Sequence, residues 1–175
     1  MKKTSNAELT RLSNQNFKAS TKTPIIIILD NIRSHHNVGS VFRTADAFLI
    51  EAIYVCGYTP QPPHRDIHKT ALGATDTVEW KYFKTTIDAI HHAKTLGFQV
   101  AAIEQAEPKV ELQNYSPASK VALVFGSEVG GVDDEVMNHV DLCIEIPQFG
   151  TKHSINISVC CGIVLWDVFK KMQWK

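Results

Sequence analysis

The sequence has no long apolar run and few cysteines. The apolar stretch from Ile25 to Leu29 is far too short to cross a bilayer. The first residues are polar and contain no apolar signal-peptide core. We therefore expect a cytoplasmic protein without a membrane span.

The four cysteines form no C-x-x-C pair. Cys160 and Cys161 are adjacent, whereas Cys56 and Cys143 lie in apolar runs that are typical of strands. This spacing argues against a zinc site and against a redox motif. We expect buried, reduced thiols.

Net charge is also absent, because 18 Lys and Arg residues balance 18 Asp and Glu residues. The charge is uneven, however, since residues 1–23 hold five basic side chains and a single acidic one, Glu8, for a net charge of +4. We expect residues 1–23 to be a basic N-terminal arm that either binds phosphates or is a solvated tail. Residues 24–175 are long enough for one domain with a full core.

Within residues 24–175, apolar runs alternate with stretches of helical periodicity. We predict strands at 25–29, 52–56, 78–83, 98–103, 121–125 and 142–146. We predict helices at 38–48, 85–96, 133–139 and 154–170, and loops at 57–63 and 105–119. Strands alternating with helices indicate an α/β fold with a mostly parallel sheet and helices on both faces. Ligands of such sheets bind beyond the carboxyl ends of the strands.

Three polar turns follow predicted strands. In the first, Asn37 is expected to cap a helix, and Arg43 follows six residues later, close enough along the helix to face the same ligand. An arginine near open helix amides suits a phosphate. The alternative is a capped helix with a surface arginine.

The second turn, from Phe125 to Val132, places three glycines around Glu128. Its spacing fits neither a P-loop nor a dinucleotide fingerprint, which disfavours a conventional ATP or NAD site. The third turn follows Ile146-Pro147 and brings Ser154, Asn156 and Ser158 to the start of the last helix, which Ser154 is expected to cap.

Together the three turns resemble the three motifs of the SpoU (TrmH-like) family of SPOUT methyltransferases, over roughly residues 24–170. The order along the chain matches, as does the spacing. The matching segments are Asn37-Val38-Gly39 through Arg43-Thr44-Ala45, then Phe125-Gly126-Ser127-Glu128 with Gly131, then Ile146-Pro147 through Ser154-Ile155-Asn156-Ile157-Ser158. The sequence departs from the family at Ser127 and Gln148, where asparagine and methionine are common.

The resemblance implies an enzyme that transfers a methyl group from S-adenosylmethionine to a ribose 2′-hydroxyl of tRNA or rRNA. It also implies a homodimer, a deep C-terminal trefoil knot and no metal. The implied cofactor-binding residues are Ile103, Glu104, Phe125, Gly126, Gly131, Ile146, Gln148, Ser154 and Ile155. The implied catalytic residues are Arg43, Asn37, Glu128, Ser154 and Asn156.

Several alternatives stay open at this point. The protein is either the expected enzyme, a non-catalytic RNA-binding protein of the same fold, or an RNA base methyltransferase. Arg43 is either a general base or an electrostatic clamp, and its permanent protonation favours the clamp. Residues 58–70, with four basic or imidazole side chains, either contact RNA phosphates or form a solvated loop.

Overall fold

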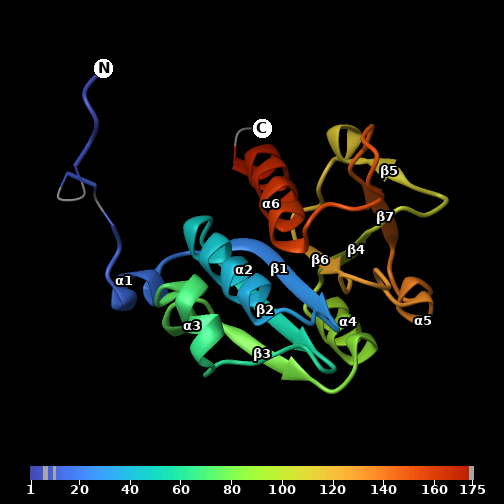
Figure 1. Cartoon of the computed structure of the whole chain (residues 1–175), viewed down its shortest axis with the longest axis horizontal. Helices are drawn as coiled ribbons and strands as arrows, with labels where there is room; N and C mark the ends of the chain where they lie inside the picture. The colour runs from blue at the N-terminus through green and yellow to red at the C-terminus, as the bar shows by residue number, and fades with distance from the viewer. Residues whose placement is uncertain (6–7, 10, 174–175) are drawn as a thin grey trace.

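A computed structural model describes residues 1–5, 8–9 and 11–173 (Figure 1). Within them, one sheet contains seven parallel strands in the order β3-β2-β1-β6-β4-β7-β5. The strands are β1 (Thr23–Asp30), β2 (Ile50–Cys56), β3 (Trp80–Phe83), β4 (Gln99–Ile103), β5 (Val110–Glu111), β6 (Val121–Phe125) and β7 (Leu142–Glu145). The α-helices are α1 (Asn14–Ala19), α2 (His35–Ala47), α3 (Arg65–Ala71), α4 (Thr86–Thr95), α5 (Asp134–Met137) and α6 (Ile157–Gln173).

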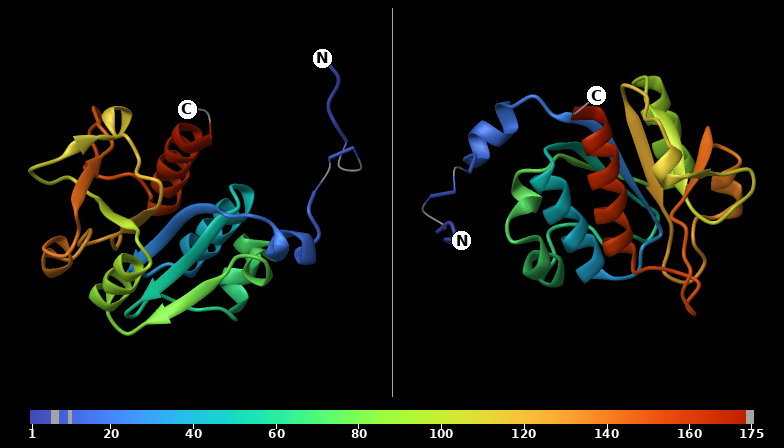
Figure 2. Two further views of the ribbon diagram at one scale, coloured as in Figure 1. Left: turned by 180° about the vertical axis from the view of Figure 1, so that it is seen from behind. Right: turned by 90° about the horizontal axis from the view of Figure 1, so that it is seen from above.

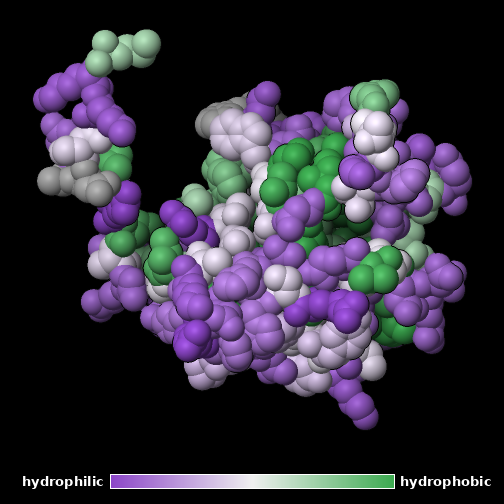
Figure 3. All heavy atoms as spheres, viewed as in Figure 1, coloured by the Kyte–Doolittle hydropathy of each residue, from purple (hydrophilic) through white to green (hydrophobic). Residues whose placement is uncertain are grey.

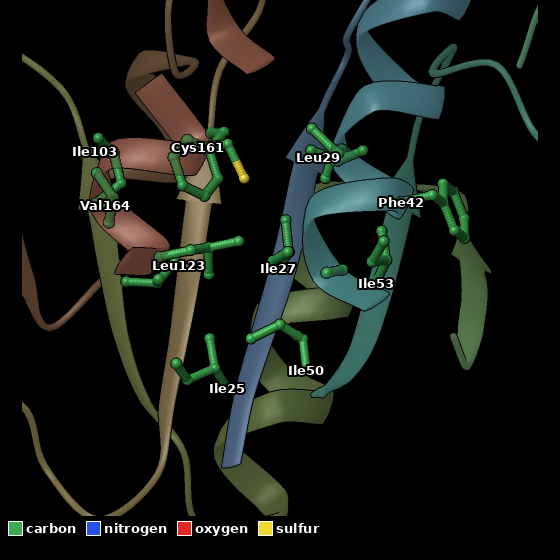
Figure 4. Packing of buried hydrophobic residues seen from close by; sticks show 14 of the residues in the cluster. Ile25, Ile27, Leu29, Phe42, Ile50, Ile53, Ile103, Leu123, Cys161 and Val164 are labelled. Atoms are coloured by element: carbon green, nitrogen blue, oxygen red, sulfur yellow. The ribbon is translucent and has the colours of Figure 1, made fainter. Parts of the chain in front are cut away.

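Helices cover both faces of the sheet, as predicted. On β1, the side chains of Ile25, Ile27 and Leu29 pack in one cluster with residues of α2 and α6 (Figure 4). Ile26 and Ile28 belong to a second cluster with residues of α4 and α5. Figure 2 shows the two layers on either side of the sheet. A strand buried on both faces must be apolar throughout, which explains the run of four isoleucines.

All six predicted strands are present, but three predictions at other positions are wrong. The stretch 58–70 contains α3, whose seven residues bury only Ile67 and Ala71 and are too few to reveal helical periodicity. The predicted loop 105–119 contains the two-residue strand β5 and a 3₁₀ turn, η2 (Leu112–Asn114). The last helix begins at Ile157 instead of Ser154.

Part of the predicted N-terminal arm packs on the domain. Phe17 of α1 is buried in the core cluster, and the Ser13 hydroxyl caps α1 by accepting a hydrogen bond from the backbone of Asn16. Residues 1–5 are exposed, and their trace extends away from the sheet (Figure 1). None of the described helices combines the length and the hydropathy that a bilayer span requires.

The four cysteines are free thiols. Three are buried, as predicted, and Cys160 is half-buried. Burial raises the pKa of Cys56 to about 12 and that of Cys160 to about 11. Such thiols carry little thiolate near neutral pH and are poor nucleophiles.

Candidate functional site

A pocket of about 670 Å³ opens beyond the carboxyl ends of β4, β6 and β7. The loops that follow these strands form its walls, which is the location expected for a ligand of a parallel sheet. All nine residues that the family resemblance implies for cofactor binding line this pocket, namely Ile103, Glu104, Phe125, Gly126, Gly131, Ile146, Gln148, Ser154 and Ile155.

The pocket combines apolar walls with several carboxylates. Ile103, Ile146 and Ile155 supply apolar surface, whereas the side chain of Phe125 is buried in the core. Carboxylates come from four further lining residues, Glu104, Glu128, Asp134 and Glu145. Sequence reasoning did not single out Asp134 and Glu145. Asp134 lies at the start of the predicted helix 133–139, and Glu145 lies near the end of the predicted strand 142–146, so their positions could have indicated them. Glu145 is ion-paired with Lys109, so the other three carboxylates give the lining its negative charge, which favours a ligand that carries positive charge.

The turn after β6 is closed tightly on itself. The backbones of Ser127 and Gly131 exchange two hydrogen bonds, of 2.9 and 3.0 Å. A Cβ atom on Gly126 would lie 2.0 Å from the backbone of Gly131 and Val132, so this position requires glycine. The Glu104 carboxylate accepts a hydrogen bond of 3.0 Å from the Val132 backbone and thereby fixes the far end of the turn. A rigid turn presents Glu128 at its tip.

Glu128 joins this turn to the start of α2. Its carboxylate accepts hydrogen bonds from the backbone N–H of Arg33 (3.0 Å) and Ser34 (3.3 Å) and from the Asn37 side chain (2.9 Å). Partial burial raises the pKa of Glu128, but these hydrogen bonds outweigh burial and hold the pKa below its ordinary value of 4.5. A helix N-terminus also favours a nearby carboxylate over the protonated acid.

Asn37 extends this connection to the third turn. Its Oδ1 atom accepts a hydrogen bond of 3.3 Å from the Asn156 side chain. Asn156 Oδ1 in turn accepts from the backbone N–H of Ser158 (3.0 Å) and Val159 (3.4 Å). A continuous chain of side-chain contacts, Glu128–Asn37–Asn156, therefore links the three turns.

Two predicted helix caps are wrong. The cap of α2 is Ser34, whose hydroxyl accepts from the backbone of Asn37, because Asn37 already lies inside the helix. A serine three residues before Asn37 is a recognisable start signal that sequence reasoning missed. The cap of α6 is Asn156, because its Oδ1 meets the first helical amides, while Ser154 stays in the exposed loop and lines the pocket.

The structure does not bring Arg43 to the pocket. Arg43 is exposed on α2 and is not among the described residues that line the pocket. Six residues correspond to about 600° of helical rotation, so Asn37 and Arg43 emerge on different sides of α2. The remaining predicted catalytic residues, Asn37, Glu128, Ser154 and Asn156, lie in or beside the pocket.

Asp30 is a buried residue at this edge that sequence reasoning overlooked. Its carboxylate is 1% exposed and accepts hydrogen bonds from the Thr86 hydroxyl (2.6 Å) and the Asp133 backbone (3.1 Å). Asp30 thus anchors the residues that follow the turn after β6 to the end of β1. An acidic residue at the end of a strand buried on both faces could have signalled it. Among the described residues, no group of three metal-ligating side chains is close enough to hold an ion.

Known proteins resemble this chain in sequence and in fold. The 23S rRNA (guanosine-2′-O-)-methyltransferase RlmB of Nitrosomonas europaea is 29% identical over 151 residues, which cover 86% of this chain and 58% of that protein. The TrmH/SpoU tRNA modifying enzyme of A. aeolicus superposes with a TM-score of 0.77 at 25% identity, over 86% of this chain and 76% of that one. The AdoMet-bound rRNA methyltransferase from Sinorhizobium meliloti gives a TM-score of 0.80 at 24% identity, over 91% of this chain and 61% of that one.

The chain spans only 58% and 62% of the length of the RlmB proteins of Nitrosomonas europaea and Neisseria meningitidis. The sequence model of the SpoU rRNA Methylase family, in contrast, matches residues 24–166, which contain all three turns and the pocket. By this match, the chain belongs to the SpoU rRNA methylase family.

Proposed function

We propose that this protein is an S-adenosylmethionine-dependent methyltransferase that acts on a ribose 2′-hydroxyl of tRNA or rRNA. The observation that carries the proposal is the Glu128–Asn37–Asn156 chain, which joins the three family motifs at the rim of one pocket. The names of the relatives support it, since RlmB acts on a guanosine 2′-oxygen and the S. meliloti enzyme was solved with AdoMet.

The pocket fits S-adenosylmethionine in size and chemistry. Its volume of about 670 Å³ suits a ligand of this class. Ile103, Ile146 and Ile155 would enclose the adenine, while the acidic lining would favour the cationic sulfur and ammonium groups. When bound, S-adenosylmethionine supplies a methyl group on a positively charged sulfur that accepts the electrons of the breaking bond.

Glu128 is poorly suited to act as the general base. Its three hydrogen bonds and its lowered pKa stabilise the carboxylate and weaken its affinity for a proton. We assign it, with Asn37 and Asn156, to positioning the rim of the pocket.

In methyl transfer, a C–O bond forms at the 2′-oxygen as the C–S bond breaks, and the hydroxyl proton leaves to water. Arg43 would stabilise the developing negative charge and the neighbouring phosphate.

We further propose that Arg43 acts across a homodimer. The exposed side of α6 carries Val159, Ile163 and Trp166, which remain 53%, 40% and 49% exposed. Their spacing places them in one stripe along the helix, and Figure 3 shows apolar side chains gathered along α6. Since α6 packs beside α2, a two-fold dimer through this stripe would carry Arg43 toward the partner's pocket.

Mixed dimers test this arrangement. Arg43→Ala removes the guanidinium, and Ser154→Trp blocks the pocket from an exposed loop position. Each variant alone should be inactive. If Arg43 acts across the dimer, unfolding and refolding the two together should restore about a quarter of the wild-type activity, because half of the dimers then contain one intact site. Lack of any recovery, with dimers formed, contradicts the arrangement.

We also propose that the C-terminal segment forms the trefoil knot of the family. Residues 146–156 lead from β7, which lies between β4 and β5, to α6 on the side of α2. On the way, the His153 carbonyl accepts a hydrogen bond of 2.6 Å from the Gln105 side chain, so the segment runs against the loop after β4. A crystal structure whose residues 146–173 can be withdrawn without passing through the loop 104–120 excludes the knot.

The activity itself is tested with methyl-labelled S-adenosylmethionine and bulk tRNA or rRNA, followed by nucleoside analysis. The proposal expects the label on the ribose 2′-oxygen. Label on a base would instead identify a base methyltransferase. RNA binding without transfer would identify a non-catalytic RNA-binding protein.

A further inference from the structure

An exposed tyrosine, outside the family motifs, lies on a loop that is held by a residue just before α2. Tyr58 follows the carboxyl end of β2 and leaves 64% of its surface in solvent. Its backbone N–H donates a hydrogen bond of 3.2 Å to the side chain of Asn31, two residues before Arg33. Arg33 in turn donates its backbone N–H to Glu128 on the pocket rim. Tyr58 is therefore connected to the pocket through two contacts.

The loop that carries Tyr58 is fixed from both sides. Thr59 is buried, and its hydroxyl donates to the carbonyl of Leu29 and accepts from the backbone of Ile32, at 3.1 and 3.0 Å. Gly57 has a φ of +60°, and a Cβ there would lie 2.0 Å from the Asn31 side chain. Exposure of the Tyr58 ring thus results from the local structure and not from a loosely attached loop. A fixed aromatic ring that faces solvent offers a flat surface on which a planar ligand group can stack.

Basic and imidazole side chains continue this surface. The rings of His35 and His64 lie 4.0 Å apart between their centroids, and the Thr70 hydroxyl donates to the carbonyl of His36 at 3.0 Å. These contacts join α3 to the start of α2. Arg33 lies two residues before His35, and Arg65 directly follows His64. Both arginines are exposed. Figure 3 shows mostly hydrophilic side chains over α3 and the neighbouring start of α2.

An exposed ring, a pair of imidazole rings in tilted contact and nearby arginines form a combination that suits single-stranded RNA. Bases stack on aromatic rings, and arginines bind the phosphates between them. We propose that Tyr58 stacks on a base close to the target nucleotide, while Arg33 and Arg65 bind phosphates of the same strand. The strand would run from the pocket past Glu128 to α3. This inference rests on the proposed function for the identity of its ligand.

Substitution of Tyr58 tests the stacking contact. Tyr58→Ala should weaken binding of short single-stranded RNA oligonucleotides about tenfold, whereas Tyr58→Phe should retain affinity because the ring remains. Leu96→Ala is the control for loss of an exposed apolar side chain, since Leu96 is 44% exposed at the end of α4, which packs on the opposite face of the sheet from α2 and α3. Fluorescence anisotropy measures the affinities. Equal affinity of Tyr58→Ala and wild-type protein would overturn the inference.

The arginines are tested through the dependence of binding on salt. Arg33→Gln and Arg65→Gln should each reduce the slope of log affinity against log salt concentration by about one phosphate contact. Lys120→Gln removes an equal charge just before the amino end of β6 and should leave the slope unchanged. Unchanged slopes in both arginine variants would contradict the assignment.

Two readouts separate this inference from the proposed function. Calorimetry with S-adenosylmethionine should give the same affinity for Tyr58→Ala and wild type, because Tyr58 does not line the described pocket. If RNA is methylated but Tyr58→Ala binds RNA normally, the inference is wrong and the proposed function holds. If RNA is never methylated but Tyr58→Ala loses RNA affinity, the contact between Tyr58 and RNA holds and the proposed enzyme activity is wrong.

Discussion

The Asn37 side-chain amide donates a hydrogen bond of 2.9 Å to Glu128, although 91 residues separate the two in sequence. The pair connects the start of α2 to the turn after β6, and Asn156 extends the contact to the start of α6. Because each residue belongs to a different motif, the geometry of one turn depends on the other two. Substitutions along this chain of contacts should affect the pocket without direct contact with a ligand.

Glu128→Gln should lower the free energy of unfolding slightly, and only at pH values at which the Glu128 carboxylate is ionised. The folded state holds the pKa of Glu128 below 4.5, so its carboxylate stabilises the fold above that pH and this contribution is lost as pH falls through the lowered pKa. We expect a loss of about 1 kcal/mol at pH 7, since glutamine cannot accept all three hydrogen bonds and the site is partly exposed. Urea unfolding of the variant and the wild type at pH 7 and at pH 3 measures this difference in the free energy of unfolding. An equal difference between variant and wild type at both pH values would contradict the assignment.

Substitutions of Asn156 should distinguish its role as the cap of α6 from its role in positioning Asn37. Asn156→Asp keeps the Oδ1 acceptor for the Ser158 and Val159 amides but lacks the amide that donates to Asn37. We expect near wild-type thermal stability with a clear loss of methyl transfer. Asn156→Ala loses both contacts and should also cost about 1 kcal/mol of folding stability. If Asn156→Asp remains fully active, the contact with Asn37 has no role in the reaction.

Much of this arrangement could be predicted from the sequence, since strongly apolar strands and short polar turns are local signals. The run Ile25 to Leu29 indicates a strand buried on both faces, and all nine residues assigned by resemblance to the cofactor line one pocket. The pocket itself depends on β6 lying between β1 and β4, which follows the order of strands in space and not along the chain.

The errors have physical causes. Ser154 and Asn156 are both good capping residues, and only the backbone path of the loop decides which one meets the amides of α6. The helix α3 is too short for its pattern to be distinguished from a loop. Arg43 and Asn37 share a motif, but helical rotation separates them, so proximity in sequence does not imply that both side chains face one site.

Gly131→Ala should destabilise the turn after β6, which is closed between Ser127 and Gly131. Gly131 has a φ of +67°, and an added Cβ would lie 2.2 Å from the Glu104 carboxylate that fixes the turn. The left-handed backbone alone costs about 1–2 kcal/mol for a residue with a side chain. We expect a lower midpoint of thermal unfolding and weaker binding of S-adenosylmethionine by calorimetry.

Gly130→Ala is the matched control for this turn. An added Cβ there meets only the Ser127 hydroxyl, at 3.5 Å, which is an ordinary contact. We expect a nearly unchanged midpoint of thermal unfolding, which is the readout for this control because Gly130 itself lines the pocket. Similar losses in both glycine variants would show that the turn responds to any added side chain, and that the contact with Glu104 is not the cause.

Arg43→Lys distinguishes a clamp from a general base. Lysine keeps the positive charge but lacks the planar fork that binds phosphate and alkoxide oxygens together, so we expect the turnover rate to fall about a hundredfold. Folding stability should be unchanged because Arg43 is exposed. With a clamp, the pH–rate profile of the residual activity keeps the wild-type shape. With a base, the variant's activity should instead rise toward about pH 10, where lysine loses its proton, and near wild-type activity at pH 7 would contradict both roles.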